Sequence, residues 1–420
     1  MRPLRPLAVL TLAALLGTAT ASPAQDLFDQ VKTYLLSGYG GLSTADRPAL
    51  VAQGQERLNS ACAPDPTGCP LDKAYDVLDQ EVEGLRDLHS SFERPDDFQD
   101  FSERAVGGSR LQYGVRLGQY DNETRLVLEV VPGSAAERAG LRRGDTLLSL
   151  NGAPYTYSAF SASRASGETI TLEVQRSAQR FRVRLTPGVS STRELPHMTF
   201  ENGVAVIRIP TFLAGGGVAQ RVHDLVRVAQ AQGASGIVVD LRDNGGGDLV
   251  ECDLAVSAFV PSFSRVSKDL RGESRTLISH GARREDGRSE DAVGGPVLWE
   301  GPLTVAVNAA SGSCSEFFAF EIQYAGRGLV VGQPTAGVAN SATQVFPLLG
   351  GAGLQLTVTH YVKPDGTPYP ERVTPQVSGS DDYARLASGQ DVLLDAAVQA
   401  LKDAPTTSSA TDRPRAQRGN

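Results

Sequence analysis

The sequence lacks the excess of positive charge that nucleic-acid-binding proteins carry. Its 420 residues include 40 Lys and Arg against 48 Asp and Glu, which gives a net charge of −8. A nucleic-acid-binding protein usually shows a basic patch or stripe, so this balance argues against such a partner. Cysteine is scarce as well, and the spacings of the four residues fit no zinc site. The sequence therefore implies no metal and no cofactor.

The apolar run near the N-terminus, "LAVLTLAALLGTA", is too short for a comfortable membrane span. Arg2 and Arg5 precede it, and the small residues Ala19 to Ala21 follow it, with Ala24 as a second cleavage point. This pattern predicts a signal peptide over residues 1–24 and export to the periplasm or the extracellular space. The alternative is an uncleaved anchor, which would keep the protein close to a membrane as a peripheral neighbour.

Export would permit disulfides. Cys62 and Cys69 flank a short loop, "APDPTG", and are predicted to form a local disulfide. Cys252 and Cys314 could pair with each other or could both remain buried thiols, because connectivity cannot be deduced from sequence alone.

The mature chain divides into regions with different patterns of apolar residues. Residues 25–106 show helical spacing, residues 107–187 alternate like paired strands, and residues 188–402 alternate between strands and helices. Within the last region, the charged, Gly-rich stretch 264–295 is expected to be a surface excursion. The tail 403–420 has the composition of a disordered segment. Strands alternating with crossover helices predict an α/β core, so we expect a multidomain protein of mixed α+β and α/β class.

The stretch "NAASGSCSEFFAF" follows a predicted buried strand and runs into an apolar helix. It contains Ser311, Ser313 and Ser315 as candidate nucleophiles. A serine hydroxyl needs a nearby base and donors for the developing oxyanion. A strand-to-helix junction can expose a side chain and aim free amides at one point. A second predicted strand ends in the glycine turn 245–247, whose amides can approach a ligand closely. Together they predict an oxyanion hole, although each feature alone also occurs in ordinary loops.

The order of these motifs resembles that of the tail-specific, or C-terminal processing, serine proteases. The resemblance spans roughly residues 25–400 and rests on "DLHSSFERPDDFQDF", "VVPGSAAERAGLRRGDTLLSLNG", "GIVVDLRDNGGG", "AVNAASGSCSEFFA" and "GRGLVVGQPTAG". It implies a ClpP/crotonase-like α/β protease core with an inserted, β-sandwich-like PDZ domain and an N-terminal helical region. It also implies protein or peptide C-termini as substrates, with the amides of Gly114 and Val115 capturing the terminal carboxylate.

Carried over residue by residue, the family nucleophile is Ser313, and Glu316 is the acidic residue three positions later. The backbone amides of Gly246 and Cys314 would be the oxyanion donors. The resemblance also implies that Cys252 and Cys314 lie close to each other and to the site.

The general base departs from the usual pattern. Where many family members carry a lysine, this chain has Val338, and no lysine occurs between Lys268 and Lys363. The tricorn-like branch of the same superfamily instead uses a histidine before the PDZ position and a glutamate near the C-terminus. In this chain these match His89 and Glu371.

Each of these roles has a structural alternative. His89 is expected close to the end of the clearest predicted helix, "YDVLDQEVEGLRDLHSSF", where a histidine can be purely structural, and Glu371 could be a solvated loop carboxylate. His360 and Lys363 are weaker candidates for the base. The sequence therefore predicts an exported serine endopeptidase that works through an acyl-enzyme. Its rival is an inactive relative that binds peptides through the PDZ groove as a scaffold.

Overall fold

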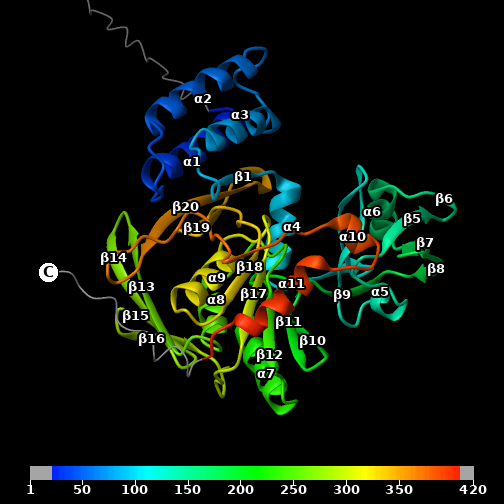
Figure 1. The fold of residues 1–420 in the computed structure, drawn as a ribbon. Helices are drawn as coiled ribbons and strands as arrows, with labels where there is room; N and C mark the ends of the chain where they lie inside the picture. Colours follow the sequence, from blue (N-terminus) through cyan, green and yellow to red (C-terminus); the bar gives the residue numbers. More distant parts are fainter. Residues whose placement is uncertain (1–20, 407–420) are drawn as a thin grey trace, which may run out of the picture.

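The computed structural model describes residues 21–406, so the predictions for the leader before Ala21 and for the tail beyond Thr406 lie outside the described residues. Figure 1 shows the N-terminal helices above an α/β core, with a separate β-rich module to one side of the core. The mixed α/β, multidomain class predicted from the sequence is confirmed.

The N-terminal region consists of three helices, α1 (Pro23–Ser37), α2 (Arg47–Ala61) and α3 (Asp72–Glu83). Ser22 caps α1, because its side chain accepts the amide hydrogen of Gln25. The disulfide between Cys62 and Cys69, predicted from their spacing, is present and closes the loop after α2.

The apolar faces of these helices form one hydrophobic core with a strand from much later in the chain, β20 (Gly353–Val362). Leu354 and Leu356 of that strand are fully buried in this core. Helix α3 ends at Glu83, so the predicted continuation to His89 is wrong. Gly84 follows as the C-cap, and Arg86 takes a positive φ of 53°, which ends the helical path.

Strand β20 is the centre of an antiparallel sheet with the order β1-β20-β13-β14-β15-β16, and β19 also pairs with β20. The other strands are β1 (Ser91–Glu93), β13 (Ser262–Asp269), β14 (Gly272–Ser279), β15 (Ala282–Glu285), β16 (Arg288–Ala292) and β19 (Ser341–Pro347). The helix α4 (Pro95–Ala105) and the short 3-10 turns η1 (Leu349–Gly351) and η2 (Leu401–Asp403) lie outside the sheets.

The stretch 264–295, expected to be a surface excursion, therefore forms most of β13 to β16. Its charged residues misled the prediction, because some of them point inward. Arg265 and Arg283 are both buried and form ion pairs with the buried carboxylate of Asp253. A buried charge needs such a partner, and sequence composition does not reveal it.

The β-rich module has the strand order β3-β4-β5-β7-β8, with β6 paired to β5. Its elements are β3 (Val115–Tyr120), β4 (Glu123–Val130), α5 (Ala135–Arg138), β5 (Thr146–Leu150), β6 (Ala153–Pro154), α6 (Tyr157–Ser166), β7 (Ile170–Arg176) and β8 (Gln179–Leu185). Strand β2 (Ser109–Gln112) pairs with β9 (Gly188–Ser191). The chain therefore enters and leaves the module side by side.

The core sheet has the order β10-β11-β12-β17-β18-β21. Its elements are β10 (His197–Glu201), β11 (Val204–Arg208), α7 (Val218–Ala231), β12 (Gly236–Asp240), α8 (Leu249–Val256), β17 (Leu303–Val307), α9 (Cys314–Tyr324), β18 (Leu329–Gly332), β21 (Val377–Ser378) and α11 (Val392–Ala400). All pairs from β11 to β21 are parallel, and every residue of β12 and β17 is buried. Such apolar runs are typical of strands covered on both faces.

Ion pairs and an apolar contact join the β-rich module to the core. Glu129 of β4 lies 2.7 Å from Arg208 of β11, and Arg143 lies 3.0 Å from Asp391, which caps α11. Leu386 of α10 (Tyr383–Ala387) packs on Leu126 and Leu128 of β4. The C-terminal segment of the described chain thus contributes to both parts.

Candidate active site

Ser313 occupies the junction between β17 and α9, with φ 51° and ψ −115°. A positive φ at a non-glycine residue is strained, and such strain persists only where the surrounding structure enforces it. The turn brings Ser313 to the wall of a cleft of about 730 Å³. The adjacent parallel strand, β12, leads into the glycine turn 245–247 on the same cleft. The cleft therefore lies at the carboxyl ends of two neighbouring strands, where ligands usually bind in α/β sheets.

The other two candidate serines have structural roles. The hydroxyl of Ser311 donates to the carbonyl oxygen of Leu241 at 2.8 Å, and that of Ser315 donates to the carbonyl oxygen of Asn244 at 2.8 Å. Both serines are 0% exposed. Of the three, only Ser313 lines the cleft.

Glu316 fixes the nucleophile turn to the segment that would carry the family lysine. Its carboxylate accepts the amide hydrogens of Ser313 at 2.9 Å, Gly337 at 2.9 Å and Val338 at 3.0 Å. It also accepts the hydroxyl of Thr335 at 2.5 Å. Burial raises the pKa of Glu316, and these four donors act in the opposite direction. A carboxylate surrounded in this way holds backbone in place, which is a positioning role.

The glycine turn approaches Ser313 so closely that only glycine fits. A Cβ atom on Gly246, where φ is 105°, would lie 2.7 Å from the Cβ of Ser313 and 2.9 Å from the amide nitrogen of Cys314. The amide of Gly246 itself donates to the side-chain oxygen of Asn244 at 2.9 Å. The amide of Cys314 is the first of α9 and has no acceptor within the helix. Of the two predicted oxyanion donors, Cys314 is thus the one whose amide needs no rearrangement.

His89 lines the same cleft as Ser313 and is held from several directions. Its Nδ1 lies 3.0 Å from the hydroxyl of Ser341, its amide donates to Asp87 at 3.0 Å, and its carbonyl accepts from Gln355 at 3.0 Å. No hydrogen bond joins the imidazole to Ser313 within residues 21–406.

His89 is 6% exposed, and this burial lowers its pKa to about 4, with the charge of Asp87 opposing the shift. At neutral pH the ring is therefore uncharged. That is the form in which an imidazole can accept a proton.

Glu371 is exposed and lies on a neighbouring hollow of about 280 Å³. Within the described part of the chain, Glu371 takes part in a hydrogen bond only through its backbone carbonyl, which accepts from the amide of Ala339 at 2.9 Å. The hydrogen-bond partner of the His89 Nδ1 is Ser341 and not Glu371. The orienting role of Glu371 stays a prediction. Val338 lines both this hollow and the cleft.

Sequence reasoning did not find Ser341. The two hydrogen-bonded side chains are 252 residues apart in the chain. Ser341 is the first residue of β19, which pairs with β20. Strand β20 also pairs with β1, which begins two residues after His89. The only signal available was its position shortly after the segment that carries the lysine in relatives.

The two weaker candidates for the base do not line the cleft. Nδ1 of His360 lies 3.2 Å from the carbonyl oxygen of Gly40. Lys363 is buried, and its ammonium lies 2.7 Å from the carboxylate of Glu321.

Cys252 and Cys314 are buried free thiols, which was one of the two possibilities left open. The thiol of Cys252 donates to the carbonyl oxygen of Cys314 at 3.0 Å, and that of Cys314 donates to the carbonyl oxygen of Gly247 at 3.1 Å. Burial raises the pKa of the Cys252 thiol. The Cys252 thiol therefore ties α8 to the start of α9, and the Cys314 thiol ties α9 to the glycine turn.

A groove of about 260 Å³ in the β-rich module runs between β3 and α6. Gly114 and Val115, predicted to capture a terminal carboxylate, both line it. Arg104, Arg116 and Glu194 line this groove and also the cleft of Ser313. The two recesses thus adjoin.

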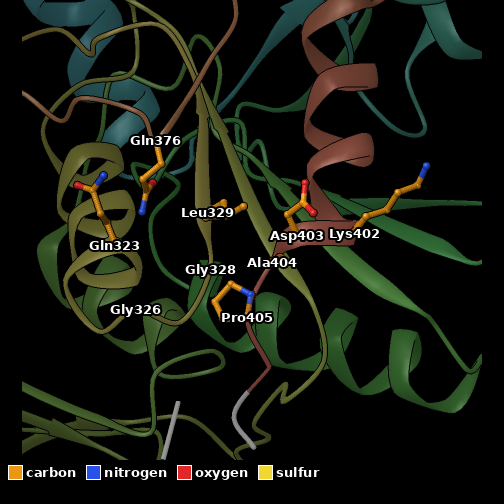
Figure 2. Close-up of a pocket in the computed structure, with 9 residues that line it drawn as sticks. All are labelled: Gln323, Gly326, Gly328, Leu329, Gln376, Lys402, Asp403, Ala404 and Pro405. Atoms are coloured by element: carbon orange, nitrogen blue, oxygen red, sulfur yellow. The ribbon is translucent and has the colours of Figure 1, made fainter. Parts of the chain in front are cut away.

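A separate hollow of about 410 Å³ lies at the far end of α9, away from Ser313 (Figure 2). It is lined by residues from α9, β18 and the C-terminal end of the described chain: Gln323, Gly326, Gly328, Leu329, Gln376, Lys402, Asp403, Ala404 and Pro405. It shares no residue with the cleft.

Residues 21–406 contain no group of three or more His, Cys, Asp or Glu that could hold a metal ion. Nor does any helix in that range have the length and apolar character needed to cross a membrane.

A strained serine on a glycine-lined cleft, with a groove of a β-rich module beside it, is the arrangement expected of a PDZ-containing serine-type peptidase. Comparison with known proteins agrees with this class. Residues 203–378 match the family model of peptidase family S41, and residues 126–176 match a PDZ domain model. Residues 203–378 are thus similar to peptidase family S41, and the predicted resemblance to this class of protease is confirmed.

Curated relatives give the same result. The chain is 29% identical over 350 residues to the carboxyl-terminal-processing protease of Picosynechococcus sp. (strain ATCC 27264 / PCC 7002 / PR-6), covering 79% of each chain. It is 26% identical to carboxyl-terminal-processing peptidase 2, chloroplastic, of Arabidopsis thaliana, covering 70% of this chain and 58% of that protein. The chain thus spans less than two thirds of the length of the Arabidopsis protein.

Solved structures share the fold. A candidate S41 protease from Bacteroides fragilis NCTC 9343 aligns with a TM-score of 0.54 at 20% identity, covering 75% of this chain and 86% of the other. Mature CPAF complexed with lactacystin aligns with a TM-score of 0.51 at 13% identity, covering 91% and 99%. At these identities the likeness concerns the fold.

Proposed function

We propose that this protein is an exported serine endopeptidase that cleaves proteins or peptides near their C-termini. The observation that carries the proposal is the strained Ser313, which shares one cleft with a neutral, buried imidazole. Two curated relatives are described as carboxyl-terminal-processing enzymes, which supports this substrate class.

The chemistry follows from the positions of the groups. His89 removes the proton from the hydroxyl of Ser313 as the serine oxygen attacks the scissile carbonyl carbon. The carbonyl oxygen takes up the negative charge and is stabilised by the amide of Cys314. The amide of Gly246 can join it when it turns away from Asn244. The imidazolium then gives its proton to the leaving amine as the C–N bond breaks. Water, deprotonated by the same imidazole, hydrolyses the acyl-enzyme and restores Ser313.

The groove of the PDZ domain suits the terminal part of the substrate. Its edge strand β3 can pair with an extended peptide, and Gly114 and Val115 line the groove, which supports their proposed role in receiving the carboxylate. The groove adjoins the cleft through Arg104 and Arg116. We infer that a substrate bound by its terminus reaches Ser313 with the preceding residues.

Export rests on the N-terminal sequence, and the start of the fold bears on the cleavage point. Ser22 caps α1, and Ala24 is 0% exposed inside the helical core. Cleavage after Ala21 leaves this cap intact, whereas cleavage after Ala24 removes it. We therefore expect the exported protein to begin at Ser22. Intact-mass measurement of the secreted chain tests this, and a mass that includes Met1 would contradict export with cleavage.

The main experiment combines labelling and cleavage. A fluorophosphonate probe should label the wild type and not Ser313→Ala, while Ser37→Ala, which removes an exposed hydroxyl on α1, should label normally. An unstructured peptide with a free C-terminus should be cleaved faster than the same peptide with an amidated terminus. Equal rates would contradict recognition of the terminal carboxylate by the PDZ groove, whereas the proposed peptidase activity would still stand.

Val338→Lys tests whether the chain is a degenerate enzyme of the lysine type. We expect no gain of activity, because the base is His89. An inert wild type that becomes active with lysine would overturn the histidine mechanism. If both forms are inert and a C-terminal peptide still binds, the protein is a peptide-binding scaffold.

A further inference from the structure

The imidazole of His89 has two nitrogens with different surroundings. Nδ1 lies 3.0 Å from the hydroxyl oxygen of Ser341, which is 5% exposed. Nε2 takes part in no hydrogen bond in the described chain, and the residue lines the cleft of Ser313. The ring can therefore act on substrate chemistry only through Nε2.

A hydroxyl on Nδ1 decides which nitrogen carries the single proton of the neutral ring. When Ser341 accepts a hydrogen from Nδ1, Nε2 has a free lone pair and can take the proton of Ser313. When Ser341 donates to Nδ1, Nε2 carries the hydrogen and cannot act as a base. Ser341 thus determines whether the catalytic unit is competent.

We propose that Ser341 is the positioning residue of this peptidase: it accepts the Nδ1 hydrogen of His89 and so keeps the Nε2 lone pair available to Ser313. This inference rests on the proposed function, because it assigns the partner of the base. It replaces the carboxylate that usually holds such a histidine with a neutral hydroxyl.

Three contacts make the arrangement rigid. Asp87 and Gln355 hold the amide and the carbonyl of His89, while Ser341 is fixed through its strand pairing with His360 of β20. Gln355 also belongs to β20. Both His89 and Ser341 are therefore held by contacts with β20, which fixes their relative position, as a preorganised site requires.

No carboxylate takes the place of Ser341 on Nδ1. The charged groups that line the two recesses beside His89 are Arg86, Asp87 and Glu371 on one side, and Arg104, Arg116, Glu194, Asp243 and Asp248 on the other. Of these, Asp87 is the one whose charge opposes the lowering of the His89 pKa, and its carboxylate accepts the backbone amide hydrogen of His89. Within residues 21–406, the hydroxyl of Ser341 is thus the only hydrogen-bond partner of Nδ1.

The test compares Ser341→Ala with Ser341→Thr, which restores a hydroxyl at a strand position that tolerates β-branching. Ser279→Ala is a matched control, because Ser279 also bonds to a histidine Nδ1, that of His280 at 2.8 Å, on the exposed end of β14. We expect Ser341→Ala to lower kcat about tenfold to a hundredfold, a part of the ~10²–10⁴ that a general base contributes. KM should change little, because Ser341 does not line the cleft. Thr should recover most of the rate, and Ser279→Ala should behave as wild type.

A readout that needs no activity comes from ¹⁵N NMR of the imidazole, assigned by comparison with His89→Gln. The wild type should show His89 protonated at Nδ1, and Ser341→Ala should show a shift toward the Nε2-protonated form. A wild type protonated at Nε2, or an Ala variant with unchanged kcat and tautomer, would overturn the inference. Failure of the proposed function has a different signature: neither labelling nor cleavage by the wild type, whatever the tautomer.

Discussion

The buried position of His89 makes a quantitative prediction about the pH dependence of cleavage. An exposed histidine titrates at a pKa of ~6.5, whereas burial lowers the pKa of His89 to about 4. The base must be unprotonated to accept a proton from Ser313, so activity falls when pH drops below this pKa. We therefore expect the acidic limb of kcat/KM, which reports the free enzyme, to have its midpoint near pH 4.

The same shift affects stability, with a sign that can be checked. Between pH 4 and pH 6.5 the unfolded chain binds a proton on His89 that the folded chain does not bind. The free energy of unfolding therefore falls as pH is lowered through this window. A shift from ~6.5 to ~4 corresponds to roughly 3 kcal/mol when it is complete.

The assay is cleavage of a fluorogenic peptide from pH 3 to pH 8, with thermal unfolding followed over the same range. His89→Gln is the control, because it keeps a polar side chain of similar size and removes the titration. We expect the variant to lose both the activity and the part of the stability change that lies between pH 4 and pH 6.5. An acidic limb at pH 6.5 in the wild type would refute the argument, since it would mean that the imidazole is solvated in the working enzyme.

Three further predictions concern other parts of the molecule. Ser313→Ala and His89→Ala should each abolish most of the cleavage, and the double variant should be hardly worse than either single one in a kcat measurement, because members of one catalytic unit are non-additive. Burial raises the pKa of Glu81 to about 8, so this carboxyl is neutral in the fold at pH 7. Its contribution to stability is lost as pH rises from the unfolded value of ~4.3 towards 8. Glu81→Gln should therefore flatten the pH dependence of the melting temperature between about pH 4.3 and pH 8, and an unchanged curve would show that Glu81 is not buried in solution. Replacing Cys62 and Cys69 by serine should cost about 2–3 kcal/mol of unfolding free energy by the loop-entropy relation, measurable by denaturant titration; a loss close to zero would contradict a closed loop.

The sequence predicted those elements that a local pattern of residues determines. The apolar runs before the serine stretch and before the glycine turn predicted strands, and both are present as the buried strands β17 and β12. The glycine turn 245–247 was located correctly because glycine is needed where backbones approach closely.

The sequence could not predict what depends on contacts between distant segments. The strands β13 to β16 escaped because their inward charges, such as Arg265, find partners elsewhere in the fold. The engagement of the Gly246 amide by Asn244 and the bond from His89 to Ser341 are set by tertiary geometry. The same holds for the low pKa of His89, which arises from burial.

Strand β20 has a consequence for the covalent design of the protein. It takes up β1 on one edge and contributes Leu354 and Leu356 to the helical core formed by residues before the PDZ domain. The N-terminal segment that carries His89 is therefore held against the core by packing and strand pairing. We infer that its position does not depend on the peptide bonds near Gly107.

A chain cut between α4 and β2 should consequently stay together as two pieces. One fragment would carry His89 and the other Ser313, so neither would be an enzyme alone, and mixing them should reconstitute the site. The catalytic unit is thus assembled from two segments that associate non-covalently, and the β-rich domain is inserted in the chain between them.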